Sequence, residues 1–189
     1  MKIMYFTNKD IIDWDTIPDI IKKTGDEVIT YTSKPTLEFI KEQNIEFIVS
    51  DRARSLITAD IIEYLPKKII NLHPSFLPWN RGYHPNYWAI KENTPFGVTI
   101  HHIDEGIDTG DIIVQTKLSY SQEDTLKTTY DRLRKYMVLL FESSWEDLRN
   151  NRLPAIKQNI KEGNLHYNKD FDGVFEKLES SWDTKIKNI

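Results

Sequence analysis

Short, continuous apolar runs alternate with amphipathic segments along the first half of the chain. The apolar runs are rich in Ile, Val and Phe, which is typical of strands buried on both faces of a sheet. Strands are expected at 2–6, 27–31, 45–50 and 67–72, and helices near 11–24, 35–43 and 58–64. This alternation predicts an α/β fold with an open, mostly parallel twisted sheet and helices on both faces.

The second half of the chain changes its pattern twice. Residues 97–115, "GVTIHHIDEGIDTGDIIVQ", are expected to form two strands joined by a loop rich in carboxylates and glycine. Apolar residues at spacings of three and four then predict one long amphipathic helix from Thr125 to Asn150. After Pro154 the chain becomes polar, and a short aromatic-containing helix is expected around 172–182.

The chain is expected to form a single domain over residues 1–189. The length suits one domain with a sizeable core, which we place at about 1–150. Residues 151–189 form a C-terminal tail, which either lies on the surface as an appendage or closes a substrate pocket.

Composition narrows the classes of function. A formal net charge of −4 with interspersed signs gives no cationic face for nucleic acid. The chain has no cysteine, so disulfides and thiolate chemistry are excluded. We find neither a signal peptide nor a run of about 20 apolar residues that could span a membrane. A cytoplasmic protein without nucleic-acid or membrane partners is expected, and a homodimer is left open.

An amide and an imidazole stand close together at the end of the fourth predicted strand. Asn71 and His73 occur in "IINLHPSFLPWNRG", where Pro74 and Pro78 restrict the following loop. Open α/β sheets bind ligands beyond the carboxyl ends of their strands, so this is where a site is expected. An Asn after a strand is more often a turn former, and a lone His is more often simply packed.

The carboxylate-rich loop that follows has several interpretations. It is an ordinary hairpin turn, a weak calcium loop without the ligand pattern of an EF-hand, or part of an active site. Zinc is a further alternative, because His101 and His102 accompany His73. Adjacent residues of a strand point to opposite faces, so at most one of the pair can join His73.

Two sequence blocks together resemble the formyltransferases that use 10-formyltetrahydrofolate. The blocks are "INLHPSFLPWNRG" and "FGVTIHHIDEGIDTGDIIVQ", and "FIVSDRARSLIT" before them is similar to the third-strand end and folate-pocket loop of that family. The resemblance implies a Rossmann-like formyltransferase fold and a one-carbon transferase that uses 10-formyltetrahydrofolate as co-substrate and no metal. It implies folate contacts from Arg54, Leu56, Ile57, Ile103, Asp104 and Gly106.

The same resemblance implies a catalytic trio of Asn71, His73 and Asp108. Asn71 and a protonated His73 would stabilise negative charge on the formyl oxygen while a primary amine attacks the formyl carbon. Asp108 would accept or relay the proton that the amine loses, and would hold the imidazole in place. His101 matches a pocket histidine found in part of the family.

The amine is expected to belong to a nucleotide-linked amino sugar. The segments "NYWAI", "ENTPFGVTIHHIDE" and "NLHYNKDFD" resemble small formyltransferases that act on 4-amino sugars of the pseudaminic-acid type, and the formylation domain of linear gramicidin synthetase. This implies a substrate like UDP-4-amino-4,6-dideoxy-N-acetyl-altrosamine, used for surface glycan or flagellin sugars. Weaker candidates for substrate contacts are Arg81, Tyr167 and Lys169, and Trp79, Tyr83, Tyr87 and Trp88 form either a stacking face or core.

Other acceptors fit the sequence less well. Methionyl-tRNA enzymes carry an additional domain that grips tRNA, whereas this chain ends at Ile189 and is acidic. Glycinamide ribonucleotide enzymes have a glycine-containing phosphate loop after the first strand, and "FTNKDIID" has no glycine. A carrier-bound aminoacyl group is a further acceptor. A catalytically silent folate-binding module is the alternative outside enzymes, although such a module would not need the complete trio.

Overall fold

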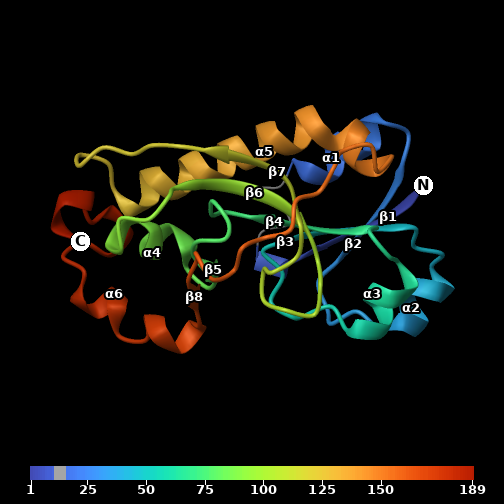
Figure 1. Ribbon diagram of the computed structural model, residues 1–189, viewed down its shortest axis with the longest axis horizontal. Helices are drawn as coiled ribbons and strands as arrows, with labels where there is room; N and C mark the ends of the chain where they lie inside the picture. The colour runs from blue at the N-terminus through green and yellow to red at the C-terminus, as the bar shows by residue number, and fades with distance from the viewer. Residues whose placement is uncertain (11–15) are drawn as a thin grey trace.

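A six-stranded sheet forms the centre of the computed structural model, which describes residues 1–10 and 16–189 (Figure 1). The strand order is β2-β1-β3-β4-β6-β7. β1 to β4 are mutually parallel, whereas β6 pairs antiparallel with both β4 and β7. The strands are β1 (Lys2–Thr7), β2 (Glu27–Tyr31), β3 (Phe47–Asp51), β4 (Ile69–His73), β6 (Gly97–His102) and β7 (Ile112–Lys117). The predicted open, mostly parallel sheet is confirmed.

Helices cover both faces of this sheet, also as predicted (Figure 1). α1 (Ile17–Lys23) and α5 (Leu126–Arg149) pack on one face, and α2 (Leu37–Glu42) and α3 (Ala59–Tyr64) pack on the other. Side chains of successive strand residues therefore enter two separate hydrophobic clusters. The helix expected near 11–24 is confirmed over Ile17–Lys23, and residues 11–15 lie outside the described residues.

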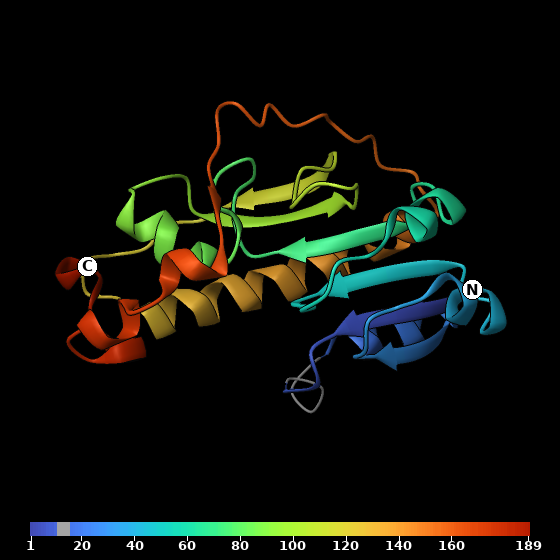
Figure 2. The same ribbon diagram turned by 90° about the horizontal axis from the view of Figure 1, so that it is seen from below.

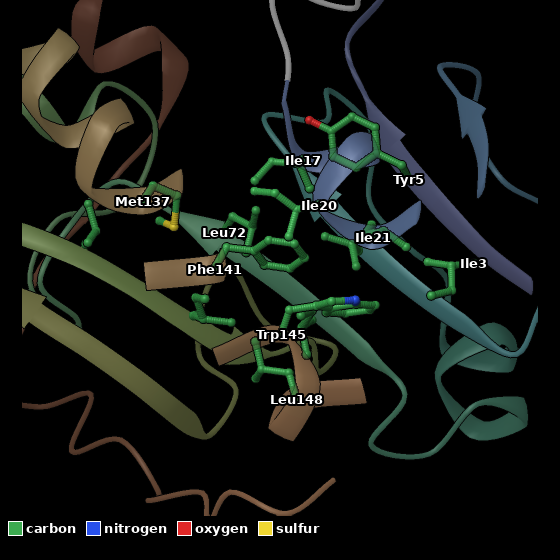
Figure 3. Close-up of a cluster of buried hydrophobic side chains, with 14 of the residues drawn as sticks. Ile3, Tyr5, Ile17, Ile20, Ile21, Leu72, Met137, Phe141, Trp145 and Leu148 are labelled. Atoms are coloured by element: carbon green, nitrogen blue, oxygen red, sulfur yellow. The ribbon is translucent and has the colours of Figure 1, made fainter. Parts of the chain in front are cut away.

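α5 supplies most of the helical core, and its local sequence explains where it begins. The Thr125 hydroxyl accepts a hydrogen bond from the Thr128 backbone N–H at 3.2 Å, and the Thr128 hydroxyl accepts one from the Thr125 backbone N–H at 2.8 Å. Along its apolar stripe, Phe141 and Trp145 are fully buried and stack at 5.0 Å. Figure 3 shows these side chains against those of α1 and the sheet.

The C-terminal tail packs against the body of the protein rather than leaving it. β5 (Arg81–Gly82) pairs in parallel with β8 (Leu165–His166), and α4 (Pro85–Lys91) follows β5. Figure 2 shows the segment before β8 crossing from the end of α5 to this small sheet. The short pairing and the helix after it were not predicted.

The end of the tail corrects one prediction. The short helix expected around 172–182 is confirmed only over Val174–Lys177, because Leu178 is extended and Ser181 has a φ of 51°. The Thr184 hydroxyl also accepts from the Ser180 N–H at 3.0 Å, which competes with helical pairing. Short helices remain, namely η2 (Asn168–Phe171), α6 (Val174–Lys177), η3 (Ser181–Asp183) and η4 (Ile186–Asn188).

Candidate active site

Neighbouring strands bring the predicted catalytic side chains to one cavity of about 720 Å³. Asn71 and His73 are two residues apart on β4, so both point to the same face of the sheet. The sheet register sets Asn71 opposite His101 on β6. Asp108 reaches the same place from the loop between β6 and β7, and all four residues line the cavity.

The Asp108 carboxylate is the centre of this arrangement. Its Oδ1 accepts a hydrogen bond from Asn71 Nδ2 at 3.1 Å and lies 3.4 Å from His101 Nε2. Its Oδ2 accepts from the backbone N–H of Gly82 at 2.9 Å and lies 3.6 Å from His73 Nδ1. One carboxylate therefore joins the two strands to β5.

His73 is held as a neutral imidazole with a defined tautomer. Its Nε2 lies 3.0 Å from the carbonyl oxygen of Asn80, which can only accept, so Nε2 carries the proton. Burial lowers the pKa of His73, and the charge of Asp108 offsets this only in part. At neutral pH Nδ1 is thus an unprotonated acceptor facing Asp108. Burial therefore disfavours the protonated His73 that was expected, whereas the charge of Asp108 favours it.

For Asp108, unlike His73, the neighbouring groups have a larger effect on the pKa than burial does. Burial alone would raise its pKa, but His73 and His101 in their protonated forms, together with the Gly82 N–H, outweigh burial and lower the pKa far below its ordinary value. The residue also has a φ of 50°, in the left-handed region that Asp tolerates better than most side chains. A permanently charged carboxylate is therefore presented to His73 by a tightly turned loop.

One of the two adjacent histidines joins the site, in agreement with strand alternation. His101 is buried, with its ring centre 6.2 Å from that of His73, and its Nδ1 donates to the His102 carbonyl at 2.7 Å. His102 does not line the cavity. Within residues 1–10 and 16–189 no group of three or more His, Cys, Asp or Glu side chains is placed to hold a metal ion.

A family model described as "Formyl transferase" matches residues 23–141, which include the complete trio. The chain belongs to the formyl transferase family. This confirms the family that the two sequence blocks predicted.

Two formyltransferases whose names or bound ligands include a nucleotide-linked sugar are similar to this chain. The crystal structure of PseJ from Anoxybacillus kamchatkensis, in complex with UDP-4,6-dideoxy-4-formamido-L-AltNAc and tetrahydrofolate, has a TM-score of 0.91 and 38% identity. That similarity covers 100% of this chain and 97% of PseJ. dTDP-4-amino-4,6-dideoxyglucose formyltransferase of Mycobacterium bovis is 31% identical over 69% of this chain and 54% of its own length.

Methionyl-tRNA formyltransferases are also similar over the core. The enzyme of Desulforamulus reducens is 36% identical over 65% of this chain and 39% of its own length. The chain thus spans about half, or less, of the length of these two curated relatives.

The residues predicted to contact folate all line the cavity. Arg54, Leu56 and Ile57 come from the segment after β3, and Ile103, Asp104 and Gly106 come from the loop after β6. Asp104 shapes its own loop, because Oδ1 accepts from the Gly106 N–H at 3.1 Å and the Thr109 hydroxyl at 2.6 Å. Leu56 is 67% exposed, which leaves an apolar side chain available at the rim.

Only one of the four weaker candidates for substrate contacts lines the cavity. His101 lines the cavity, but Arg81, Tyr167 and Lys169 do not. Arg81 lies in the β5–β8 pairing, and the Lys169 ammonium lies 5.7 Å from the ring centre of Tyr167. Of the four aromatic residues considered for stacking, Tyr83 and Tyr87 line the cavity, whereas Trp79 and Trp88 do not.

Sequence reasoning missed a charged group beside the cavity. Asp51 at the end of β3 is fully buried and pairs with Arg134 of α5 through two bonds of 2.9 Å. Arg52, which lines the cavity, contacts the same carboxylate at 3.2 Å. The sequence did offer one signal of this buried ion pair. Arg134 lies four residues after Tyr130, on a helix face that is otherwise apolar.

An aromatic wall from the tail was missed as well. Phe171, Phe175 and Trp182 line the cavity together with Tyr130 of α5. Ring contacts connect them, at 5.1 Å between the two phenylalanines and 5.4 Å between Phe175 and Trp182. The tail therefore contributes side chains to the lining of the cavity.

Proposed function

We propose that this protein transfers a formyl group from 10-formyltetrahydrofolate to the primary amine of a nucleotide-linked amino sugar. The acceptor class is the UDP-linked 4-amino-4,6-dideoxy-N-acetyl-altrosamine type, used for surface glycan or flagellin sugars. The observation that carries this proposal is the similarity to PseJ, which covers essentially the whole length of both chains. The trio of Asn71, His73 and Asp108 on one cavity supports it.

The cavity suits a folate beside a second ligand. Its volume of about 720 Å³ lies within the usual range for ligand sites. Leu56, Ile57, Ile103 and Ile107 give one part of it an apolar lining next to the trio. Bound there, 10-formyltetrahydrofolate would supply an activated formyl group to the adjacent amine.

The aromatic wall supports a nucleotide as the other ligand. Tyr130, Phe175 and Trp182 offer ring faces and edges on which a planar base can stack. Arg52 at the cavity wall supplies a cation of the type that recognises phosphate. Trp182 is 41% exposed, so part of this surface is open to an incoming ligand.

His73, Asp108 and Asn71 each have a separate role in the attack of the amine. His73 Nδ1 is the unprotonated base of the site, so it takes the proton that the amine loses while its nitrogen bonds to the formyl carbon. Asp108 stabilises the resulting imidazolium across 3.6 Å. His73 then returns the proton to the nitrogen from which the formyl group departs, so atoms and charge balance.

Asn71 is the candidate donor to the formyl oxygen. Its Nδ2 lies between Asp108 Oδ1 at 3.1 Å and His101 Nε2 at 3.2 Å. A ligand oxygen that displaces one of these partners would receive an amide N–H as negative charge develops on it. No step in this scheme requires a metal.

A panel of acceptors tests the proposal. The protein is incubated with 10-formyltetrahydrofolate and, separately, with UDP-linked and dTDP-linked amino sugars, glycinamide ribonucleotide and methionyl-tRNA. Mass spectrometry should detect a formylated UDP-linked sugar at the highest kcat/KM. Higher kcat/KM for glycinamide ribonucleotide or methionyl-tRNA would overturn the sugar assignment, and binding of folate without any turnover would favour the silent module.

A further inference from the structure

A buried glutamine of the tail holds the backbone of the loop that carries Asp108. The Gln158 side chain donates through Nε2 to the carbonyl oxygen of Asp108 at 3.0 Å and to that of Gly110 at 2.6 Å. Gln158 is 7% exposed, whereas its neighbours Lys157 and Asn159 are exposed. A single amide group thus bridges two carbonyls within three residues of chain.

The loop has a conformation that needs such a bridge. Asp108 is in the left-handed region, and a Cβ at Gly110 would overlap the carbonyl oxygen of His102, so the chain turns tightly against β6. The turn directs the two carbonyls toward the tail. Buried carbonyls without a donor are unfavourable, so Gln158 both satisfies them and fixes the distance between them.

Backbone hydrogen bonds fix the tail to the sheet just before Gln158. Ile156 exchanges two backbone hydrogen bonds of 2.8 Å with Ile112, the first residue of β7. Farther along, β8 pairs with β5, whose Gly82 N–H donates to Asp108 Oδ2. Figure 2 shows this tail segment passing the β6–β7 hairpin on its way to β8. The same tail therefore supports Asp108 at its backbone and at its carboxylate.

We propose that Gln158 is a positioning residue for formyl transfer, which acts through Asp108 by keeping the carboxylate opposite His73. This inference rests on the proposed role of Asp108. A displacement of about 1 Å at a reacting centre typically lowers rates by roughly 100-fold. Gln158 lies outside the cavity lining, so its substitution removes no ligand contact.

Gln158→Met tests this inference, because methionine keeps the side chain's length and carries neither a donor nor a charge. We expect kcat/KM to fall at least about tenfold, toward the 100-fold effect of a misplaced group. Gln158→Ala provides a second variant if the first does not fold. Gln122→Met, at an exposed glutamine before α5, is the matched control and should keep wild-type kinetics.

The pH profile separates positioning from a general loss of stability. The titratable groups that face His73 are Asp108 from the β6–β7 loop and His101 from β6. Asp108 raises the pKa of His73 and His101 lowers it, so retraction of the carboxylate lowers that pKa further. The acid limb of kcat/KM should move to lower pH in Gln158→Met, whereas a merely less stable protein keeps the wild-type limb.

A double-mutant cycle completes the test. If Gln158 acts through Asp108, then Gln158→Met should have little further effect on kcat/KM in an Asp108→Asn background. Folded Gln158 variants with wild-type kcat/KM and pH profile, or a fully additive loss in the double mutant, would overturn the inference. If Asp108→Asn alone retains full activity, the proposed function of the trio fails instead.

Discussion

Asp108→Asn removes the charge opposite His73 while almost preserving the shape of the side chain. Two unit charges 3.6 Å apart interact by about 5 kcal/mol at an effective dielectric constant of about 20. That attraction is present only when His73 has accepted the proton, so its loss raises the barrier rather than weakening substrate binding. We therefore expect kcat/KM to fall by roughly 10³-fold, since 1.36 kcal/mol corresponds to a factor of ten.

The assay measures initial rates of formylated UDP-sugar formation at saturating 10-formyltetrahydrofolate, together with the thermal unfolding midpoint. Asp111→Asn is a matched control, because Asp111 is an exposed carboxylate at the end of the same loop and does not line the cavity. The control should retain its rate. A folded Asp108→Asn protein with kcat/KM within about tenfold of wild type would refute the electrostatic reasoning.

Three further outcomes follow from the structure. Because burial lowers the pKa of His73, kcat/KM should be flat at neutral pH and decline only as pH falls through a pKa below 6.5; an acid limb above pH 7 would contradict a neutral resting base. Gly82→Ala should lower the unfolding midpoint and activity together, since φ is 85° and a Cβ would overlap the carbonyl of His166; wild-type values in both measurements would be inconsistent with the β5–β8 support. Asp51→Asn should cost about 3–5 kcal/mol in urea denaturation, because it leaves the Arg134 cation buried without its partner; a loss below about 1 kcal/mol would show that the pair contributes little.

The sheet was predictable because its strands are buried on both faces. Continuous Ile, Val and Phe runs identify β1 to β4, and the stripe that ends at Trp145 and Leu148 identifies α5. The end of the tail was not predictable, because an aromatic, partly helical sequence there is divided by the backbone of Leu178 and Ser181. Those breaks come from local hydrogen bonds and tertiary packing, which leave no periodic signal.

Part of the site could also be predicted from the sequence, and part of it could not. Side-chain groups with characteristic chemistry, such as Asn71 and Asp108, could be found in the sequence through their motifs. The Gly82 N–H is a backbone donor that only a positive φ and a paired strand direct toward Asp108. Gln158 lies fifty residues after Asp108, and nothing in its surrounding sequence marks it as a donor to that loop. Tertiary contacts, rather than residue type, give both their roles.

The most direct test of formyl transfer to a sugar amine follows an isotope-labelled formyl group. The protein is mixed with 10-formyltetrahydrofolate labelled at the formyl carbon and with UDP-4-amino-4,6-dideoxy-N-acetyl-altrosamine, and the product is examined by NMR. The label should appear as a formamide on the sugar nitrogen, at a rate that depends on His73 and Asp108. Label that appears as free formate, or that remains on folate while another amine is formylated efficiently, would contradict the proposed function.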